Sequence, residues 1–98
     1  MWGSWQLFGC TFWQPTRHTL QLPVAATTQP IVVVGTRHDP ATPYAGAVAM
    51  AASLGNAELL TWEGQGHTAV GRDDWINRHV ADYLASLTVP PHNTRCAA

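Results

Sequence analysis

An aspartate and a histidine stand in two polar loops of this sequence, each shortly after a run of apolar residues. Asp39 lies four residues after Gly35, and His67 lies five residues after Trp62. A histidine titrates near neutral pH, so it can take a proton from a hydroxyl nucleophile and later return it. A neighbouring carboxylate holds the ring in one tautomer and stabilises its protonated form. These two residue types therefore predict the acid and the base of a catalytic triad.

The apolar runs before these loops predict two strands. Residues 31–35, Ile-Val-Val-Val-Gly, form a continuous β-branched run, which is typical of a strand buried on both faces. Residues 58–62 predict a second, shorter strand. The polar residues 36–42 and the glycine-rich residues 63–68 are predicted as the loops that follow.

Two helices are predicted to alternate with the strands. The first opens at Thr42-Pro43, because threonine is a good N-cap and proline suits the first helical position, and it runs through Tyr44 to about Leu54. The second spans roughly residues 73–87. The order strand, helix, strand, helix predicts an α/β fold with parallel strands. Two strands are too few for a stable parallel sheet, so the sheet is expected to be incomplete.

The predicted topology brings Asp39 and His67 together. In open α/β sheets, ligands bind at the carboxyl ends of the strands, and both residues follow such an end. The two residues are 67 − 39 = 28 positions apart, which leaves room for one crossover helix and one strand. A hydrogen bond between them is then expected.

Composition limits the classes of function. Only 11% of the 98 residues are charged and 46% are hydrophobic, which suggests a piece that lies against more protein. The net charge is −1 and no basic run occurs, so a nucleic-acid partner is not expected. No apolar stretch approaches the roughly 18 residues of a membrane span. We expect one partial domain over 1–98, with a helical or looped lead-in over 1–29, the β-α-β-α unit over 30–89 and a tail over 90–98.

Two segments together resemble a known family. Residues 30–43, which contain Asp39-Pro40-Ala41-Thr42-Pro43, look like the acid-bearing segment of α/β-hydrolases, and residues 64–68 (Gly-Gln-Gly-His-Thr) resemble their histidine loop. Both are most similar to the tripeptidyl-aminopeptidase-like C-terminal domain of secreted actinobacterial serine peptidases. Residues 10–13 and the last helix and tail are also similar, so the resemblance covers nearly the whole chain.

The resemblance implies the C-terminal part of a serine hydrolase. Its complete enzyme would cleave a peptide or an ester through an acyl-serine intermediate, without a cofactor, with Asp39 and His67 as acid and base. It also implies an extracellular or cell-envelope location. No G-x-S-x-G elbow occurs, and Ser4, Ser53 and Ser86 are not on predicted strand-to-helix turns, so no nucleophile is assigned. The isolated chain is expected to be inactive, with a missing N-terminal hydrolase portion as its partner.

Other readings of the same residues remain. Asp39 before Pro40 is also a common turn residue, and a histidine between small residues is also a common surface loop residue. The chain could be a non-catalytic remnant, or a domain that docks on another hydrolase fragment. No H-x-x-x-H or C-x-x-C motif predicts a metal site among the five histidines.

The two cysteines lie near opposite ends of the chain. A disulfide between Cys10 and Cys96 would close most of the sequence, and loop-closure entropy would then stabilise the fold by about 4 to 5 kcal/mol. Two unpaired thiols, or thiols paired with residues elsewhere, are the alternatives. The sequence does not choose between them.

Overall fold

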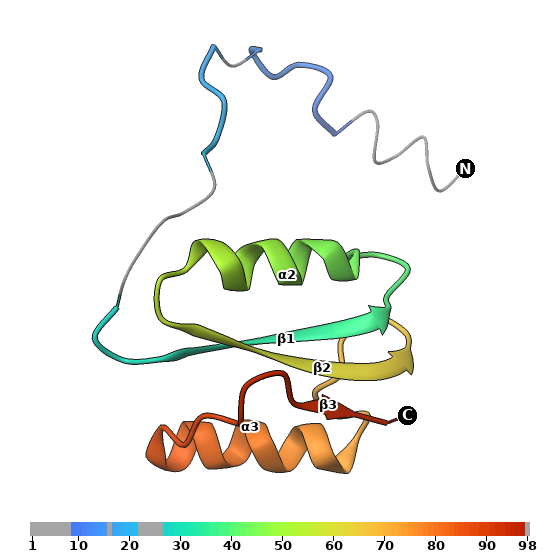
Figure 1. Ribbon diagram of the computed structural model, residues 1–98. Coiled ribbons are helices and arrows are strands. Elements are labelled where there is room, and N and C mark those ends of the chain that lie inside the picture. Colours follow the sequence, from blue (N-terminus) through green and yellow to red (C-terminus); the bar gives the residue numbers. More distant parts are fainter. Residues whose placement is uncertain (1–8, 16, 22–26, 98) are drawn as a thin grey trace.

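The computed structural model describes residues 9–15, 17–21 and 27–97. Its centre is a parallel sheet of three strands in the order β1 (Ile31–His38), β2 (Ala57–Gln65) and β3 (Arg95–Cys96). Helix α2 (Tyr44–Ser53) connects β1 to β2, and helix α3 (Asp74–Ser86) lies between β2 and β3. The two helices lie on opposite sides of the sheet (Figure 1). The predicted α/β fold with parallel strands and an incomplete sheet is confirmed.

Both long strands continue beyond their predicted ends. The ladder runs from Ile31 opposite Ala57 to Thr36 opposite Trp62, and it resumes at His38 opposite Gln65 after a register shift. Residues 36–38 and 63–65, which were predicted as loops, therefore belong to the sheet. The polar side chains at these positions gave no strand signal in the sequence. In the structure Arg37 donates two hydrogen bonds, of 3.2 and 3.3 Å, to the Glu63 carboxylate on the neighbouring strand, so both charged groups are paired within the sheet.

The third strand was not predicted. It is only two residues long and pairs with β2 through Thr61 opposite Arg95 and Trp62 opposite Cys96. The preceding prolines and the lack of an apolar run gave no strand signal. The tail predicted over 90–98 thus adds a short strand to the sheet next to β2.

Helix α2 begins one residue later than its predicted first turn. Pro43 occupies the N-cap position, and no side chain caps the helix, so the prediction that Thr42 is the N-cap is wrong. The helix lies close to β1 at Gly35, where an added Cβ would be 2.9 Å from the Cβ of Ala47 and 3.2 Å from the ring of Tyr44. A glycine at this position allows α2 to approach the sheet.

Helix α3 is one residue shorter at each end than predicted. Asp73 is its N-cap, and the carboxylate accepts hydrogen bonds from the backbone N–H groups of Trp75 and Ile76. Leu87 ends the helix in a left-handed conformation, with φ 56°. The helix is amphipathic, and it turns Ile76 and Val80 toward the sheet.

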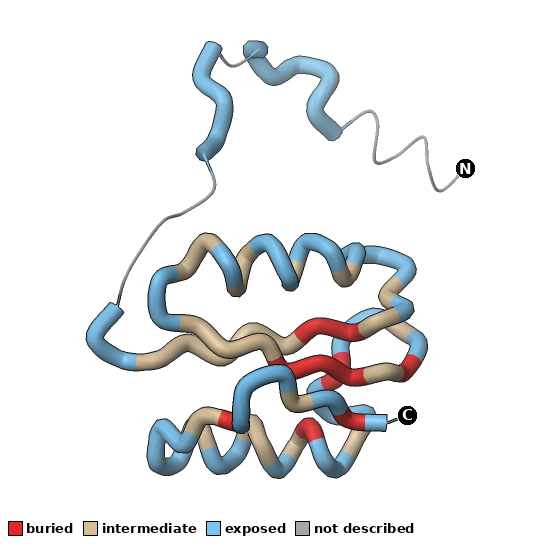
Figure 2. Tube along the Cα trace, viewed as in Figure 1, coloured by how far each residue is buried: buried red, intermediate tan, exposed pale blue. Residues whose placement is uncertain are grey.

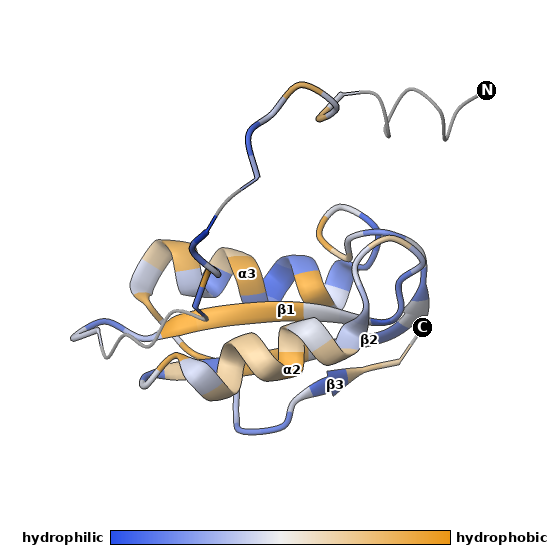
Figure 3. Ribbon diagram, turned by 90° about the horizontal axis from the view of Figure 1, so that it is seen from above, coloured by the Kyte–Doolittle hydropathy of each residue, from blue (hydrophilic) through white to orange (hydrophobic). Residues whose placement is uncertain are grey.

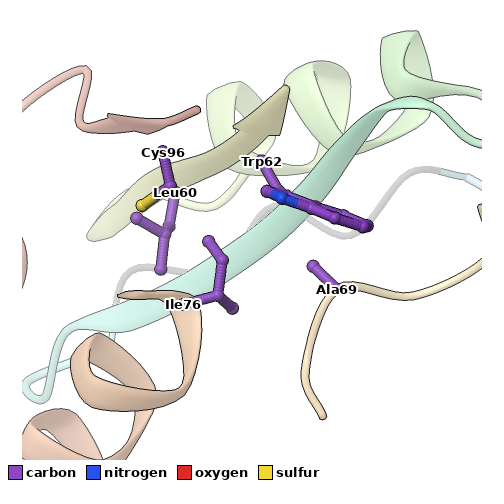
Figure 4. Close-up of a cluster of buried hydrophobic side chains, with 5 residues drawn as sticks. All are labelled: Leu60, Trp62, Ala69, Ile76 and Cys96. Atoms are coloured by element: carbon purple, nitrogen blue, oxygen red, sulfur yellow. The ribbon is translucent and has the colours of Figure 1, made fainter. Parts of the chain in front are cut away.

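The hydrophobic core lies between the sheet and α3. In Figure 2 buried residues lie mainly along β2 and near the carboxyl end of β1. Figure 4 shows the five buried hydrophobic side chains of the core: Leu60, Trp62, Ala69, Ile76 and Cys96. Val32, Val34 and Val80 pack against this cluster. Trp62 covers Gly64 so closely that an added Cβ would lie 2.3 Å from the indole ring.

The opposite side of the sheet is much less covered. No residue of α2 is buried, and β1 forms an edge of the sheet. Apolar colouring extends along β1 and much of α2 in Figure 3. In the lead-in, Phe12 and Trp13 are exposed by 92% and 78%. These uncovered apolar surfaces agree with a chain that lies against more protein.

Two further findings concern the cysteines and the helices. Cys10 is an exposed free thiol and Cys96 is a buried one, so the disulfide is absent from this structure and its formation stays a prediction. Of the helical or looped lead-in predicted over 1–29, residues 1–8, 16 and 22–26 lie outside the described residues. Within the described ranges, neither helix is long and apolar enough to cross a membrane.

Candidate active site

The carboxyl ends of β1 and β2 place the two predicted residues next to each other. Asp39 directly follows β1, and His67 comes two residues after the end of β2. The backbone N–H of Gly66 donates to the carbonyl of His38 at 3.2 Å, which ties the two loops together at their base. The parallel pairing of the strands therefore positions the acid and the histidine.

Asp39 and His67 are in direct contact. Nδ1 of the His67 ring lies 3.2 Å from Oδ1 and 3.1 Å from Oδ2 of Asp39, so an Nδ1–H group donates to both carboxylate oxygens. Among the described residues, the ring's hydrogen bonds all use Nδ1. The carboxylate thus holds the ring through one nitrogen, which keeps Nε2 as the atom that can accept a proton.

The main chain and a threonine hold the Asp39 carboxylate. Oδ1 accepts hydrogen bonds from the backbone N–H groups of Ala41 and Thr42 at 2.8 and 2.9 Å. Oδ2 accepts from the Thr42 hydroxyl at 2.8 Å and, at 3.5 Å, from the backbone N–H of Thr68. The Thr42 N–H is the largest cause that holds the pKa of Asp39 well below its usual range, and the Ala41 N–H, the Thr42 hydroxyl and His67 act in the same direction. Asp39 is therefore ionised throughout the neutral range.

Positive φ angles shape the histidine loop. Gly66 has φ 125°, a conformation that is essentially restricted to glycine, and Thr68 has φ 70°. An added Cβ at Gly66 would lie 3.0 Å from the guanidinium of Arg72. Ala69 is buried in the core and anchors the loop after His67. The loop thus turns sharply enough to bring the ring over Asp39.

Neither serine in the described part of the chain is positioned as a nucleophile for this histidine. Ser53 donates to the carbonyl of Met50 at 3.1 Å, and Ser86 donates to the carbonyl of Asp82 at 3.0 Å, both within helices away from the pair. Thr42 is near the ring, but its hydroxyl faces Nδ1 at 3.3 Å and is engaged with Asp39. Ser4 lies outside the described residues.

Comparison with known proteins identifies the family. The sequence model of the family described as TAP-like protein matches residues 1–96. The chain belongs to this family of α/β-hydrolases. The match spans nearly the whole sequence, as the resemblance of the acid and histidine segments implied.

The TAP-like chain is also similar to part of several mycobacterial proteins. It is 40% identical over 99 residues to the Serine protease Hip1 of Mycobacterium tuberculosis, a match that covers 96% of this chain and 18% of that protein. It is 40% identical over 90 residues to Carboxylesterase B of the same species, with 90% of this chain and 17% of that protein covered. A Putative hydrolase of Mycobacterium bovis gives the same values. The chain thus spans less than a fifth of the length of these relatives.

Two other histidines of the TAP-like chain, His79 and His92, make their contacts elsewhere in the fold. His79 packs edge-on against Trp75 on α3, with ring centroids 5.4 Å apart, and His92 contacts Glu58 at 3.0 Å. The side chain of His38 is exposed and contributes no hydrogen bond to Asp39. Within the described ranges, no three metal-ligating side chains come together.

A groove of about 670 Å³ opens beside the pair. It lies between β1, α2 and the two loops, and its lining includes Val33, Ala47, Met50, His67 and Val70. The lining is mostly apolar, apart from Asp39, His67 and three threonines. The groove therefore joins the exposed side of His67 to the uncovered edge of the sheet.

Sequence reasoning found the pair but missed the threonine in its support. Thr42 was interpreted only as a helix cap, because threonine before proline at a helix start usually has that role. The spacing of Asp39 and Thr42, three residues apart in a proline-containing turn, is the signal that could have found it. Aspartate in such turns accepts hydrogen bonds from residues two and three positions later.

Proposed function

We propose that this TAP-like chain provides the acid and the base of a serine-hydrolase triad. The observation that carries the proposal is the contact of Asp39 with Nδ1 of His67 at the carboxyl ends of neighbouring strands. An acid that accepts from Nδ1 leaves Nε2 to serve as the base. Membership of the α/β-hydrolase family and the chain order, acid before histidine, support the same assignment.

In this mechanism Nε2 of His67 takes the proton of a serine hydroxyl as that oxygen attacks a carbonyl carbon. The ring is then positively charged, and the ionised Asp39 stabilises it through the Nδ1–H bond. His67 next donates the same proton to the leaving amine or alcohol, which yields an acyl-serine. Water hydrolyses that intermediate with His67 again as base and then as acid.

The nucleophile and most of the oxyanion hole are proposed to come from sequence outside this chain. Three features support this origin of the missing groups: β1 is an uncovered edge strand, no residue of α2 is buried, and a groove opens beside His67. A parallel sheet normally has both of its faces covered by other protein. The proposed partner is the N-terminal portion of a hydrolase, which adds strands next to β1. The 98-residue chain alone is then inactive.

The substrate is proposed to be a peptide, cleaved near its N-terminus, or an ester. The names of the relatives, a serine protease and a carboxylesterase, are compatible with both. The preference for a peptide follows from the resemblance to tripeptidyl-aminopeptidase-like domains. Both substrates pass through the same acyl-serine chemistry.

A chimera tests this function. The matching part of the mycobacterial serine protease is replaced by this chain, and hydrolysis of chromogenic peptide and ester substrates is measured. We expect the chimera to hydrolyse at least one class, His67→Ala to abolish turnover, and His38→Ala to leave it unchanged. An active chimera that is insensitive to His67→Ala would overturn the site. Turnover by the 98-residue chain alone, lost in His67→Ala, would overturn the missing nucleophile.

A second candidate is a non-catalytic docking domain. The exposed Phe12 and Trp13 and the open edge of β1 favour an association with another α/β-hydrolase fragment. A chimera that is well folded but has no activity with either substrate class would favour this role over catalysis.

A further inference from the structure

The two oxygens of Asp39 are held in different ways. Oδ1 is fixed by the main chain, through the N–H groups of Ala41 and Thr42, and any residue except proline at these positions would supply the same bonds. Oδ2 has one short bond besides its contact with the ring, from the Thr42 hydroxyl at 2.8 Å, because the N–H of Thr68 is at 3.5 Å. The orientation of the carboxylate plane thus depends on one side chain.

The Thr42 hydroxyl also faces the histidine. Its oxygen lies 3.3 Å from Nδ1 of His67, and its single hydrogen is donated to Oδ2 of Asp39. The oxygen therefore presents a lone pair toward Nδ1, which suits a ring that carries its hydrogen there. If the ring carried its hydrogen on Nε2 instead, the lone pair of Nδ1 would face three oxygen atoms, two of the Asp39 carboxylate and one of the Thr42 hydroxyl, and that contact would be repulsive.

A helix-capping role does not account for this threonine. Helix α2 has Pro43 at its N-cap and no side-chain cap hydrogen bond, so the Thr42 hydroxyl serves the acid and not the helix. Thr42 also lines the groove beside His67. The hydroxyl is therefore part of the site and not of the element that follows it.

From this geometry we propose that Thr42 is a positioning residue for the Asp39–His67 pair. Its hydroxyl fixes Oδ2, keeps both carboxylate oxygens on Nδ1 and favours the ring tautomer that leaves Nε2 free of hydrogen. This inference rests on the proposed function, since that tautomer matters only if His67 is a base. Thr42 acts through Asp39 and touches no reacting atom.

Ring-nitrogen NMR of the ¹⁵N-histidine-labelled 98-residue chain tests the proposal. At a pH where the ring is neutral, the two nitrogen shifts of His67, assigned by their loss in His67→Gln, report the tautomer. We expect hydrogen on Nδ1 in the wild type and in Thr42→Ser, which keeps the hydroxyl. In Thr42→Val, which keeps the shape but not the hydroxyl, we expect the tautomer equilibrium to move about tenfold toward Nε2–H, as the loss of one hydrogen bond to a charged group predicts.

Two controls separate this effect from a general disturbance. Thr88→Val removes a hydroxyl that bonds to Ser86 at 2.8 Å, and it should leave the His67 shifts unchanged. Asp39→Asn should remove the preference for Nδ1–H. An unchanged tautomer in Thr42→Val, together with a changed one in Asp39→Asn, would overturn the role of Thr42 and leave the proposed function standing. Hydrogen on Nε2 in the wild type would overturn both.

Kinetics in the chimera give a second readout that does not require the isolated chain to fold. Thr42→Val should lower kcat about tenfold with KM unchanged, and Thr42→Ser should restore kcat to within about twofold of the wild type. A rise in KM without a fall in kcat, or no rescue by serine, would overturn the positioning role.

Discussion

The side chain of Asp39 is 5% exposed, whereas the His67 ring that it contacts at 3.1 Å is 52% exposed. A base must reach a proton on another group, and an acid that only orients and stabilises the ring need not. Shelter from solvent strengthens the hydrogen bonds that hold the carboxylate. This difference in exposure fits the roles proposed for the two residues.

Asp39→Asn should lower kcat of the chimera by roughly 10³- to 10⁴-fold. The amide can still accept the backbone hydrogen bonds, but it no longer favours hydrogen on Nδ1 and cannot stabilise a charged ring. Steady-state kinetics and a circular dichroism spectrum of the same preparation check this. A folded variant that keeps more than a tenth of the activity would contradict the role of Asp39 as the acid.

Gly66→Ala should reduce activity, and Gly71→Ala should not. Both glycines have positive φ, of 125° and 91°, so both substitutions should cost about 1 to 3 kcal/mol of unfolding free energy. Only Gly66 adjoins His67, and only there would the added Cβ meet Arg72. Chemical unfolding measures the loss of unfolding free energy that both variants should share. The kcat of the chimera should fall only in Gly66→Ala. Equal loss of kcat in both would show that the loop conformation at Gly66 is not specific to the site.

Leu60→Ala should destabilise the fold by about 2 to 5 kcal/mol, because Leu60 is fully buried and its truncation leaves a cavity. Leu84→Ala is the matched control, since Leu84 is 75% exposed on α3 and the same atoms are removed. Its effect should stay within about 0.5 kcal/mol. Urea unfolding of both variants measures the difference. Similar losses of unfolding free energy in the two variants would contradict the position of Leu60 in the core.

Acid should destabilise the chain partly through Asp39. Hydrogen bonds, first of all from the Thr42 N–H, hold the folded-state pKa of Asp39 below the unfolded value of about 3.9. Its stabilisation is therefore complete above that unfolded value and is lost as pH falls toward the lower folded value. The hydrogen bond from Arg37 lowers the pKa of Glu63, which contributes with the same sign.

Urea midpoints between pH 6 and pH 3 measure this dependence. We expect a fall in the wild type below about pH 4. Asp39→Asn should show a shallower fall, with the remaining slope due to Glu63 and other carboxylates. Parallel curves for the two proteins would mean that Asp39 does not titrate differently in the folded and unfolded states.

The sequence alone determined the order of the long elements and the identity of the pair. The β-branched run at 31–35 and the alternation of predicted strands with predicted helices gave the α/β fold, because the hydrophobic pattern encodes local structure. The positions of Asp39 and His67 after two such strands gave their proximity, since parallel strands end at one edge. Polar residues 36–38 and 63–65 hid the ends of the strands, because their pairing partners are distant in sequence.

Only the tertiary structure decided what the hydroxyl of Thr42 contacts. Its type and place predicted a helix cap, in which the hydroxyl oxygen would accept a backbone N–H. In the structure the hydroxyl instead donates to the carboxylate of Asp39, which is held next to His67, and hydrogen bonds to charged acceptors are the stronger ones. Strand β3 is also decided by tertiary structure: residues 95–96 are a strand because they pair with β2, and their local sequence has no strand preference. Contacts between residues far apart in the chain decide such features, and local sequence patterns do not contain them.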